Sequence, residues 1–330
     1  MSGKYFDTLI HHYNTVTTTV TFPDQLAPFN KGENYNWTVA DRTVNLMRRN
    51  NIPIHGHVLV YHEKNRAWLT EGTREEVIQN MNDYITTVLR HFKGRISSWE
   101  VVNEAIDGYN LTNTQVRGDW RNCINRNNNP WFNKLGSDYI ELAFRATRAA
   151  DPDIKLYYND WDLENPNKAE VVRKMIQDIN GRYKMETGGN RNLIEGVTSQ
   201  AHIFNMNLNI NNAHISLEKL ISLGIEIAIS EMDVPTVNWT ASNVGNGRDT
   251  MMSERDQIAQ ALVYARLMNL YKEYSAHITR VTFWGIDDRT SWISTGNPLL
   301  FDWKLNAKQA FHAVSDPDGF IRQYGGRARR

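Results

Sequence analysis

Short apolar segments alternate with longer amphipathic segments along the whole chain, and few folds accommodate that order. Seven segments are predicted to be β-strands from their β-branched and aromatic residues: 14–19, 54–61, 98–105, 155–160, 196–202, 226–234 and 279–286. The main helices predicted between them are 74–92, 137–150, 169–179, 216–223 and 253–274. In the first of these, Val77, Met81, Ile85 and Val88 recur at helical spacing. A strand–helix repeat of roughly thirty to forty residues is typical of a parallel β/α barrel or sheet.

The chain contains no glycine-rich phosphate loop, so a barrel is favoured over a doubly wound nucleotide-binding sheet. The polar stretches 122–129 and 238–248 follow strand ends and are interpreted as loops of one domain. We therefore expect a single α/β domain over residues 1–330, a (β/α)8 TIM barrel with a flexible tail at 325–330. The first strand of an eight-stranded barrel is missing or not recognisable, because 7–13 look like the end of a helix.

Composition excludes several classes of function. Lys plus Arg and Asp plus Glu each number 37, so the chain lacks the basic field of a nucleic-acid-binding protein. No apolar run is long enough for a membrane span, and no signal peptide is recognisable. The single cysteine, Cys123, excludes an internal disulfide and a multi-cysteine metal site.

Two carboxylates stand at strand ends. Glu104 closes one buried strand pattern and Glu231 closes another. Because the carboxyl ends of all strands in a parallel barrel face one mouth, these side chains should converge there. A pair of converging carboxylates is what glycoside hydrolysis requires, one as proton donor and one as nucleophile or base. The alternative is an ordinary salt bridge at each strand end.

Histidines cluster at the same strand ends: His55, His57 and His62 around one, and His202, after Gln200, at another. Three imidazoles at a barrel mouth could hold Zn²⁺, and metal hydrolysis is therefore an alternative. No HExxH motif occurs, and the neighbouring Asn, Gln and Glu residues suit hydroxyl recognition better. We expect neither a metal nor a cofactor.

Aromatic residues are abundant, with ten Trp and fourteen Tyr. Several lie at or just after predicted strand ends: Tyr61, Trp68, Tyr158, Trp161, Trp284 and Trp292. Any one of them could be a core residue. Gathered at one face of a barrel, they would offer flat surfaces for sugar rings, and the pattern indicates a carbohydrate site.

Motifs spread over residues 13–314 read HGHVLVYH at 55–62, WEVVNEA at 99–105, LYYND at 156–160, QAH at 200–202, SEMDV at 230–234, VTFWG at 281–285 with Ser291-Trp292, and PLLFD at 298–302. Together they resemble the motifs of the endo-β-1,4-xylanases of glycoside hydrolase family 10. The resemblance implies a retaining enzyme on a (β/α)8 barrel. Xylan or xylo-oligosaccharides would be its substrate.

The resemblance also implies roles for individual residues. Glu104 would be the acid/base, with a raised pKa, and Glu231 the nucleophile. His202, oriented by Asp233, would bind Glu231. The substrate would contact a larger set: His57, Tyr61, His62, Lys64, Asn103, Tyr158, Trp161, Gln200, Trp284 and Trp292. Of these, Asn103 would hold the 2-hydroxyl of the sugar under attack, Trp284 and Trp292 would stack on the glycone, and Tyr158 or Trp161 would meet the aglycone.

The chain departs from the family pattern on the glycone side. Where the family carries a Glu-Asn pair and a Lys, residues 18–23 read TTVTFP, without carboxylate, amide or ammonium. Tyr61 replaces a usual Trp, and Lys64 or a neighbour replaces a usual Gln. We expect an altered second glycone subsite, for which loops around 110–129 and 183–192 could compensate.

Two alternatives to xylan hydrolysis remain open: a related retaining β-glycosidase on another glycan or small glycoside, and a non-catalytic carbohydrate-binding barrel. The family and a polymeric substrate imply secretion or a cell-surface location. A longer protein could carry an upstream carbohydrate-binding module, and a module inserted after the first strand would explain that strand's absence here.

Overall fold

The structure, a computed structural model, describes residues 3–108, 111–245 and 251–326. Within them the strands form one parallel sheet in chain order: β1 (Val16–Thr18), β2 (Ile54–Val60), β3 (Ser98–Asn103), β4 (Lys155–Asp160), β5 (Gly196–Ser199), β6 (Glu226–Met232) and β7 (Ile278–Phe283). Every one of these strands overlaps a predicted strand. The expected parallel barrel architecture is confirmed.

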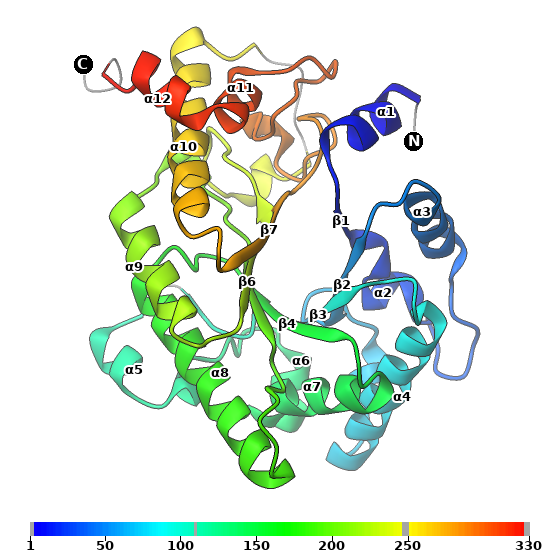
Figure 1. Ribbon diagram of the computed structural model, residues 1–330. Coiled ribbons are helices and arrows are strands. Elements are labelled where there is room, and N and C mark those ends of the chain that lie inside the picture. Colours follow the sequence, from blue (N-terminus) through cyan, green and yellow to red (C-terminus); the bar gives the residue numbers. More distant parts are fainter. Residues whose placement is uncertain (1–2, 109–110, 246–250, 327–330) are drawn as a thin grey trace.

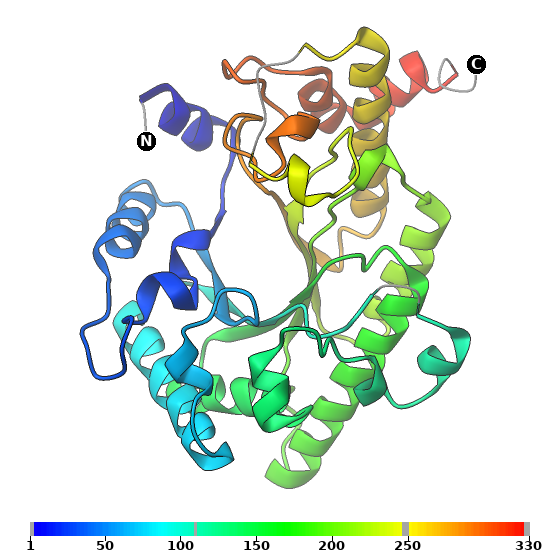
Figure 2. The same ribbon diagram turned by 180° about the vertical axis from the view of Figure 1, so that it is seen from behind.

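Helices surround the strands as an outer layer in both views (Figures 1 and 2). Their bounds are α1 (Gly3–His12), α2 (Pro23–Leu26), α3 (Thr38–Arg49), α4 (Arg74–Phe92), α5 (Asn113–Arg117), α6 (Pro130–Leu135), α7 (Asp138–Ala150), α8 (Pro166–Thr187), α9 (Ile210–Ile221), α10 (Glu254–Glu273), α11 (Gln309–Ser315) and α12 (Pro317–Tyr324). The predicted helix 169–179 was too short, because α8 continues through a polar last turn to Gly188, whose φ of 66° ends it.

Local sequence accounts for where the longest elements begin. Thr73 caps α4 by accepting from the N–H of Glu76, whose side chain accepts from the N–H of Thr73 in return. The apolar face of α4, including Val77, Met81 and Ile85, is fully buried against the sheet layer. Strand β2 is buried along its whole length, as expected for a strand covered on both faces.

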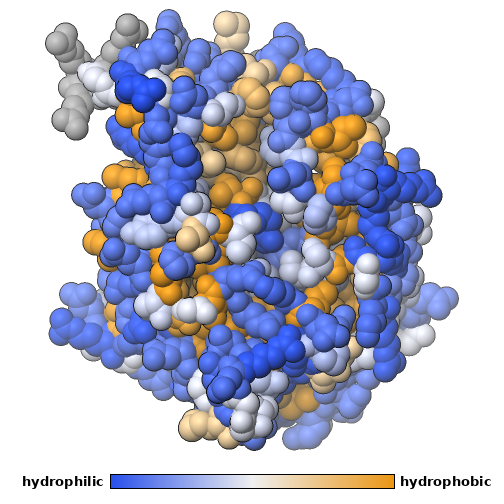
Figure 3. Space-filling view, viewed as in Figure 1, coloured by the Kyte–Doolittle hydropathy of each residue, from blue (hydrophilic) through white to orange (hydrophobic). Residues whose placement is uncertain are grey.

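The ring of strands is open between β1 and β7, which pair only with β2 and β6 respectively. No strand in the described residues fills the interval, so these residues contain seven strands and two sheet edges, as expected for a barrel whose first strand is not found. All six residues of β7 are at least partly exposed, unlike those of β2 and β3. Figure 3 shows that this face of the molecule is hollowed and that hydrophobic residues reach the hollow.

Some expectations fall outside the described residues: Asn110 of the loop 110–129, residues 246–248 of the loop 238–248, and the tail beyond 326. In the described residues, no helix is long and apolar enough to cross a membrane.

Candidate active site

A cavity of about 2140 Å³ opens at the carboxyl ends of the strands. It brings together twelve of the predicted site residues: His57, Tyr61, His62, Lys64, Asn103, Glu104, Trp161, Gln200, His202, Glu231, Trp284 and Trp292. The predicted convergence of Glu104 and Glu231 on one cavity is therefore observed. The cavity also reaches the open interval between β1 and β7, where Tyr13, Thr17 and Thr282 line it.

Glu104 follows β3 in a left-handed conformation, with φ of 54°. Its Oε2 accepts from the Tyr61 hydroxyl at 3.0 Å, and its Oε1 accepts from the amides of Asn103 at 3.0 Å and Gln200 at 2.9 Å. Burial raises the pKa of Glu104 to about 7, and the nearby charges of Asp160 and Glu231 add to the rise. A carboxyl with this pKa can both give and take a proton near neutral pH.

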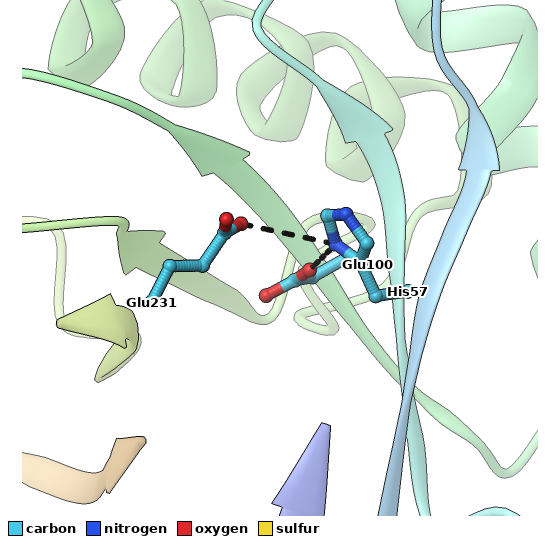
Figure 4. Close-up of side chains that lie close together, drawn as sticks. All are labelled: His57, Glu100 and Glu231. Carbon is cyan, nitrogen blue, oxygen red and sulfur yellow. Dashed lines mark hydrogen bonds and ion pairs between the residues drawn. The ribbon is translucent and has the colours of Figure 1, made fainter. Parts of the chain in front are cut away.

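Glu231 lies near the end of β6 and is almost fully buried. Its Oε1 accepts from the Asn159 amide at 2.8 Å, and its Oε2 lies 3.4 Å from Nε2 of His202. Nδ1 of His57 lies 4.0 Å from Oε1 (Figure 4). Glu231 thus faces the cavity from a position fixed by three neighbours.

His202 joins Glu231 to Asp233. Its Nδ1 lies 2.9 Å from Oδ1 of Asp233, while Oδ2 of Asp233 accepts from the Trp292 indole at 2.8 Å. Burial lowers the pKa of His202, but the charges and hydrogen bonds of Asp233 and Glu231 together outweigh burial and raise the pKa to about 10. At neutral pH His202 is therefore an imidazolium between two carboxylates. Asp233 itself is fully buried behind the cavity wall.

Glu100 lies beneath Glu231, buried in the middle of β3, and its carboxylate bonds Nδ1 of His57. Although burial opposes it, this carboxylate raises the pKa of His57. His57, Glu100 and Glu231 form the only group of three possible metal ligands in the described residues, with ligand atoms within 4.8 Å of one another (Figure 4). Direct hydrogen bonds among protein atoms account for their positions: the imidazole binds Glu100, and Asn159 binds Glu231. We assign them no metal.

Asn159, at the end of β4, connects the two glutamates. Its amide donates to Glu231 and, at 2.8 Å, to Oδ1 of Asn103, which in turn donates to Glu104. The hydroxyls of Thr198 and Ser230 donate to the side-chain oxygen of Asn159, Oδ1, at 2.6 and 2.7 Å. Sequence analysis did not select Asn159, although its place beside Asp160 at a strand end was a usable signal.

The aromatic residues divide into two groups. Trp161 lines the cavity and lies over the buried ammonium of Lys168, 3.6 Å from the ring centroid. Trp284 lines it near His57, with ring centroids 5.4 Å apart. The expectation that Tyr158 meets a sugar is wrong here: its side chain is fully buried, and its hydroxyl donates to Asp160 and accepts from the N–H of Ala105.

The unusual stretch 18–23 also lies at the cavity. Thr18, Thr19, Val20 and Phe22 line it, and Phe22 packs edge-on against His57 with centroids 5.1 Å apart. The hydroxyl of Thr21 donates to the carbonyl of His57 at 2.6 Å. These lining side chains offer hydroxyls and apolar groups but no charge or amide.

The model of glycosyl hydrolase family 10 matches residues 2–317. The chain is 35% identical, over 97% of its length, to the endo-1,4-beta-xylanase A of Thermoanaerobacterium saccharolyticum and to the exoglucanase XynX of Acetivibrio thermocellus. It spans only 25% and 27% of the lengths of these relatives.

Solved structures give the same result. A family 10 xylanase with a bacterial Ig-like domain from termite gut superposes with a TM-score of 0.84 at 34% identity, covering 98% of this chain and 72% of that one. An intracellular xylanase of Thermoanaerobacterium saccharolyticum, solved with xylotriose, superposes with a TM-score of 0.79 at 31% identity, covering 94% and 90%. With its parallel barrel and paired glutamates, the chain belongs to glycosyl hydrolase family 10.

Proposed function

We propose that the chain is an endo-1,4-β-xylanase that cleaves internal bonds of xylan with retention of configuration. The observation that carries this proposal is the pairing of Glu104, whose pKa lies near 7, with Glu231 at the wall of one cavity. Family membership and the names of the relatives support the substrate class.

In the first step Glu231 attacks the anomeric carbon and forms a glycosyl ester, while protonated Glu104 gives its proton to the departing glycosidic oxygen. Esterification removes the negative charge of Glu231, which is one of the charges that raise the pKa of Glu104. The pKa of Glu104 then falls, so the carboxylate is ready to accept a proton from water in the second step. Water attacks the same carbon and releases Glu231.

The surrounding residues hold this pair in place. His202, fixed by Asp233, and Asn159 both bind Glu231 and orient its carboxyl group for attack. Asn103 and Gln200 hold Glu104 and lie where hydroxyls of the reacting sugar would pass. Trp161 and Trp284 supply flat surfaces on different sides of the cavity.

The test is product analysis on xylan and on defined xylo-oligosaccharides, comparing the wild type with Glu231→Gln. Short β-configured products from the wild type and none from the variant would support the proposal. Initial products with the α configuration would contradict the retaining mechanism, and no turnover by either protein would favour a carbohydrate-binding barrel.

A second glycone subsite of altered chemistry is part of the proposal. The cavity wall at residues 18–22 lacks charged and amide groups, so a second glycone sugar would gain little from it. We expect turnover to rise only weakly when the glycone is lengthened from one sugar to two. A strong dependence would remove this part of the proposal.

The same wall favours a second candidate function, hydrolysis of another β-linked glycan or of small glycosides. Parallel assays on xylan, β-glucan and aryl glycosides decide between the two.

A polymeric substrate such as xylan would place the enzyme outside the cell, and fractionation of the native host would test that location.

A further inference from the structure

Two exposed hydrophobic residues line the cavity without belonging to the catalytic network. Trp239 is 52% exposed and Val244 is 37% exposed, and both lie in the loop between β6 and α10. Other exposed large hydrophobic residues in the described part of the chain, such as Phe29 at 77%, lie away from this cavity. Exposed apolar surface concentrated at a binding cavity indicates a ligand contact.

The loop carrying Trp239 is fixed on both sides. The N–H of Asn205 donates to the carbonyl of Val237 at 2.9 Å, and the N–H of Gly245 donates to the carbonyl of Trp292 at 2.8 Å. Gly296 allows the loop to lie close, because a Cβ there would come within 2.7 Å of Pro235. Trp239 is thus carried by an anchored loop, which lowers the entropy lost on binding.

A series of rings leads from the nucleophile towards this loop. The ring centroid of Trp292 lies 5.1 Å from that of His202, which binds Glu231. The ring centroid of Phe204 lies 6.0 Å from that of Trp292. Phe204 and Trp239 both line the cavity, and Asn205, next to Phe204, bonds the Trp239 loop. The exposed Asn238 lines the cavity beside Trp239 and offers an amide to ring hydroxyls.

We propose that Trp239 forms an outer sugar-binding subsite on the β5–β6 side of the cavity. Its indole takes the apolar face of one pyranose ring of a β-1,4-linked chain that continues past Phe204 to the catalytic glutamates. This subsite rests on the proposed function, since it binds a distal part of the same substrate.

The experiment compares Trp239→Ala with Phe29→Ala, which removes another exposed aromatic ring away from the cavity. The kcat/KM values for xylobiose, xylotriose and xylohexaose are measured for both variants and for the wild type. We expect Trp239→Ala to lose roughly three- to tenfold on xylohexaose, through KM, and to match the wild type on xylobiose. Phe29→Ala should match the wild type throughout, and Trp239→Tyr should recover most of the loss.

The outcomes separate this subsite from the proposed function. If the wild type does not cleave xylo-oligosaccharides, both proposals fail. If it cleaves them and Trp239→Ala is unchanged on xylohexaose, the subsite is refuted while the function stands. An equal loss on all lengths would show a structural effect and would also refute the subsite.

Discussion

The side-chain amide of Asn159 donates a 2.8 Å hydrogen bond to Oε1 of Glu231. Because the same amide also bonds Asn103, a single side chain on β4 relates the positions of the groups at the ends of β3 and β6. The two glutamates are therefore spaced through a bonded series of side chains as well as by the backbone of the barrel.

Replacing Asn159 by Asp tests this connection. The new carboxylate would remove the donor that binds Glu231 and would place a second acidic group beside it. We expect kcat to fall by about two orders of magnitude, in line with the loss of a positioned hydrogen-bond donor in an active site. Asn159→Gln, which keeps an amide donor, should be more active than Asn159→Asp, whereas wild-type activity of Asn159→Asp would contradict the connection.

The raised pKa of Glu104 predicts how stability changes with pH. A folded-state pKa near 7, above the ordinary value of 4.5, means that the folded protein binds the proton more tightly than the unfolded chain. Stability is therefore lost as pH rises from about 4.5 through 7. Glu104→Gln should be more stable than the wild type by about 2 kcal/mol at pH 8 and show little difference at pH 4, measured by urea unfolding. An equal difference at both pH values would contradict this assignment.

Asp233→Asn should release His202. Since the charge of Asp233 is the main cause that raises the pKa of His202 to about 10, we expect that pKa to fall towards 6.5, observable by NMR titration of the imidazole. The stabilisation from charged His202 is complete below about pH 6.5 in the wild type and is lost as pH rises towards 10. The loss of stability in the variant, compared with the wild type, should therefore be largest in acidic and neutral solution. A His202 pKa unchanged by the substitution would disprove the coupling.

Lys168→Met should destabilise the fold. The ammonium is fully buried and lies 2.7 Å from Oδ1 of Asp160, so its removal leaves a buried carboxylate without its cation. We expect a loss of about 3–5 kcal/mol at neutral pH and a smaller loss at low pH, where Asp160 is protonated. The double variant with Asp160→Asn should regain part of the loss. Thermal unfolding at two pH values checks this, and additive losses would exclude the pair as the cause.

Periodicity predicted the strands well because buried parallel strands are continuous apolar runs, and their ends carry the polar residues that meet at the mouth. That rule was enough for Glu104 and Glu231. It could not identify Glu100, whose role depends on which neighbour its side chain meets inside the barrel. Nor could it separate Tyr158 from Trp161, since successive residues of a strand face opposite sides and packing decides which side faces the cavity.

Trp239 was missed for a different reason. It lies in a polar loop with no periodic pattern, and its position depends on hydrogen bonds to loops distant in sequence. Only the folded arrangement shows that this loop borders the cavity.

The open interval between β1 and β7 has a consequence for how the protein behaves at high concentration. Each of these edges presents backbone N–H and C=O groups without a strand partner in the described residues, and such an edge can pair with the edge of another molecule. A closed cylinder has no site of this kind. Between copies of this chain, strand pairing would therefore begin at this seam, and a lysine or proline placed along β1 would oppose it.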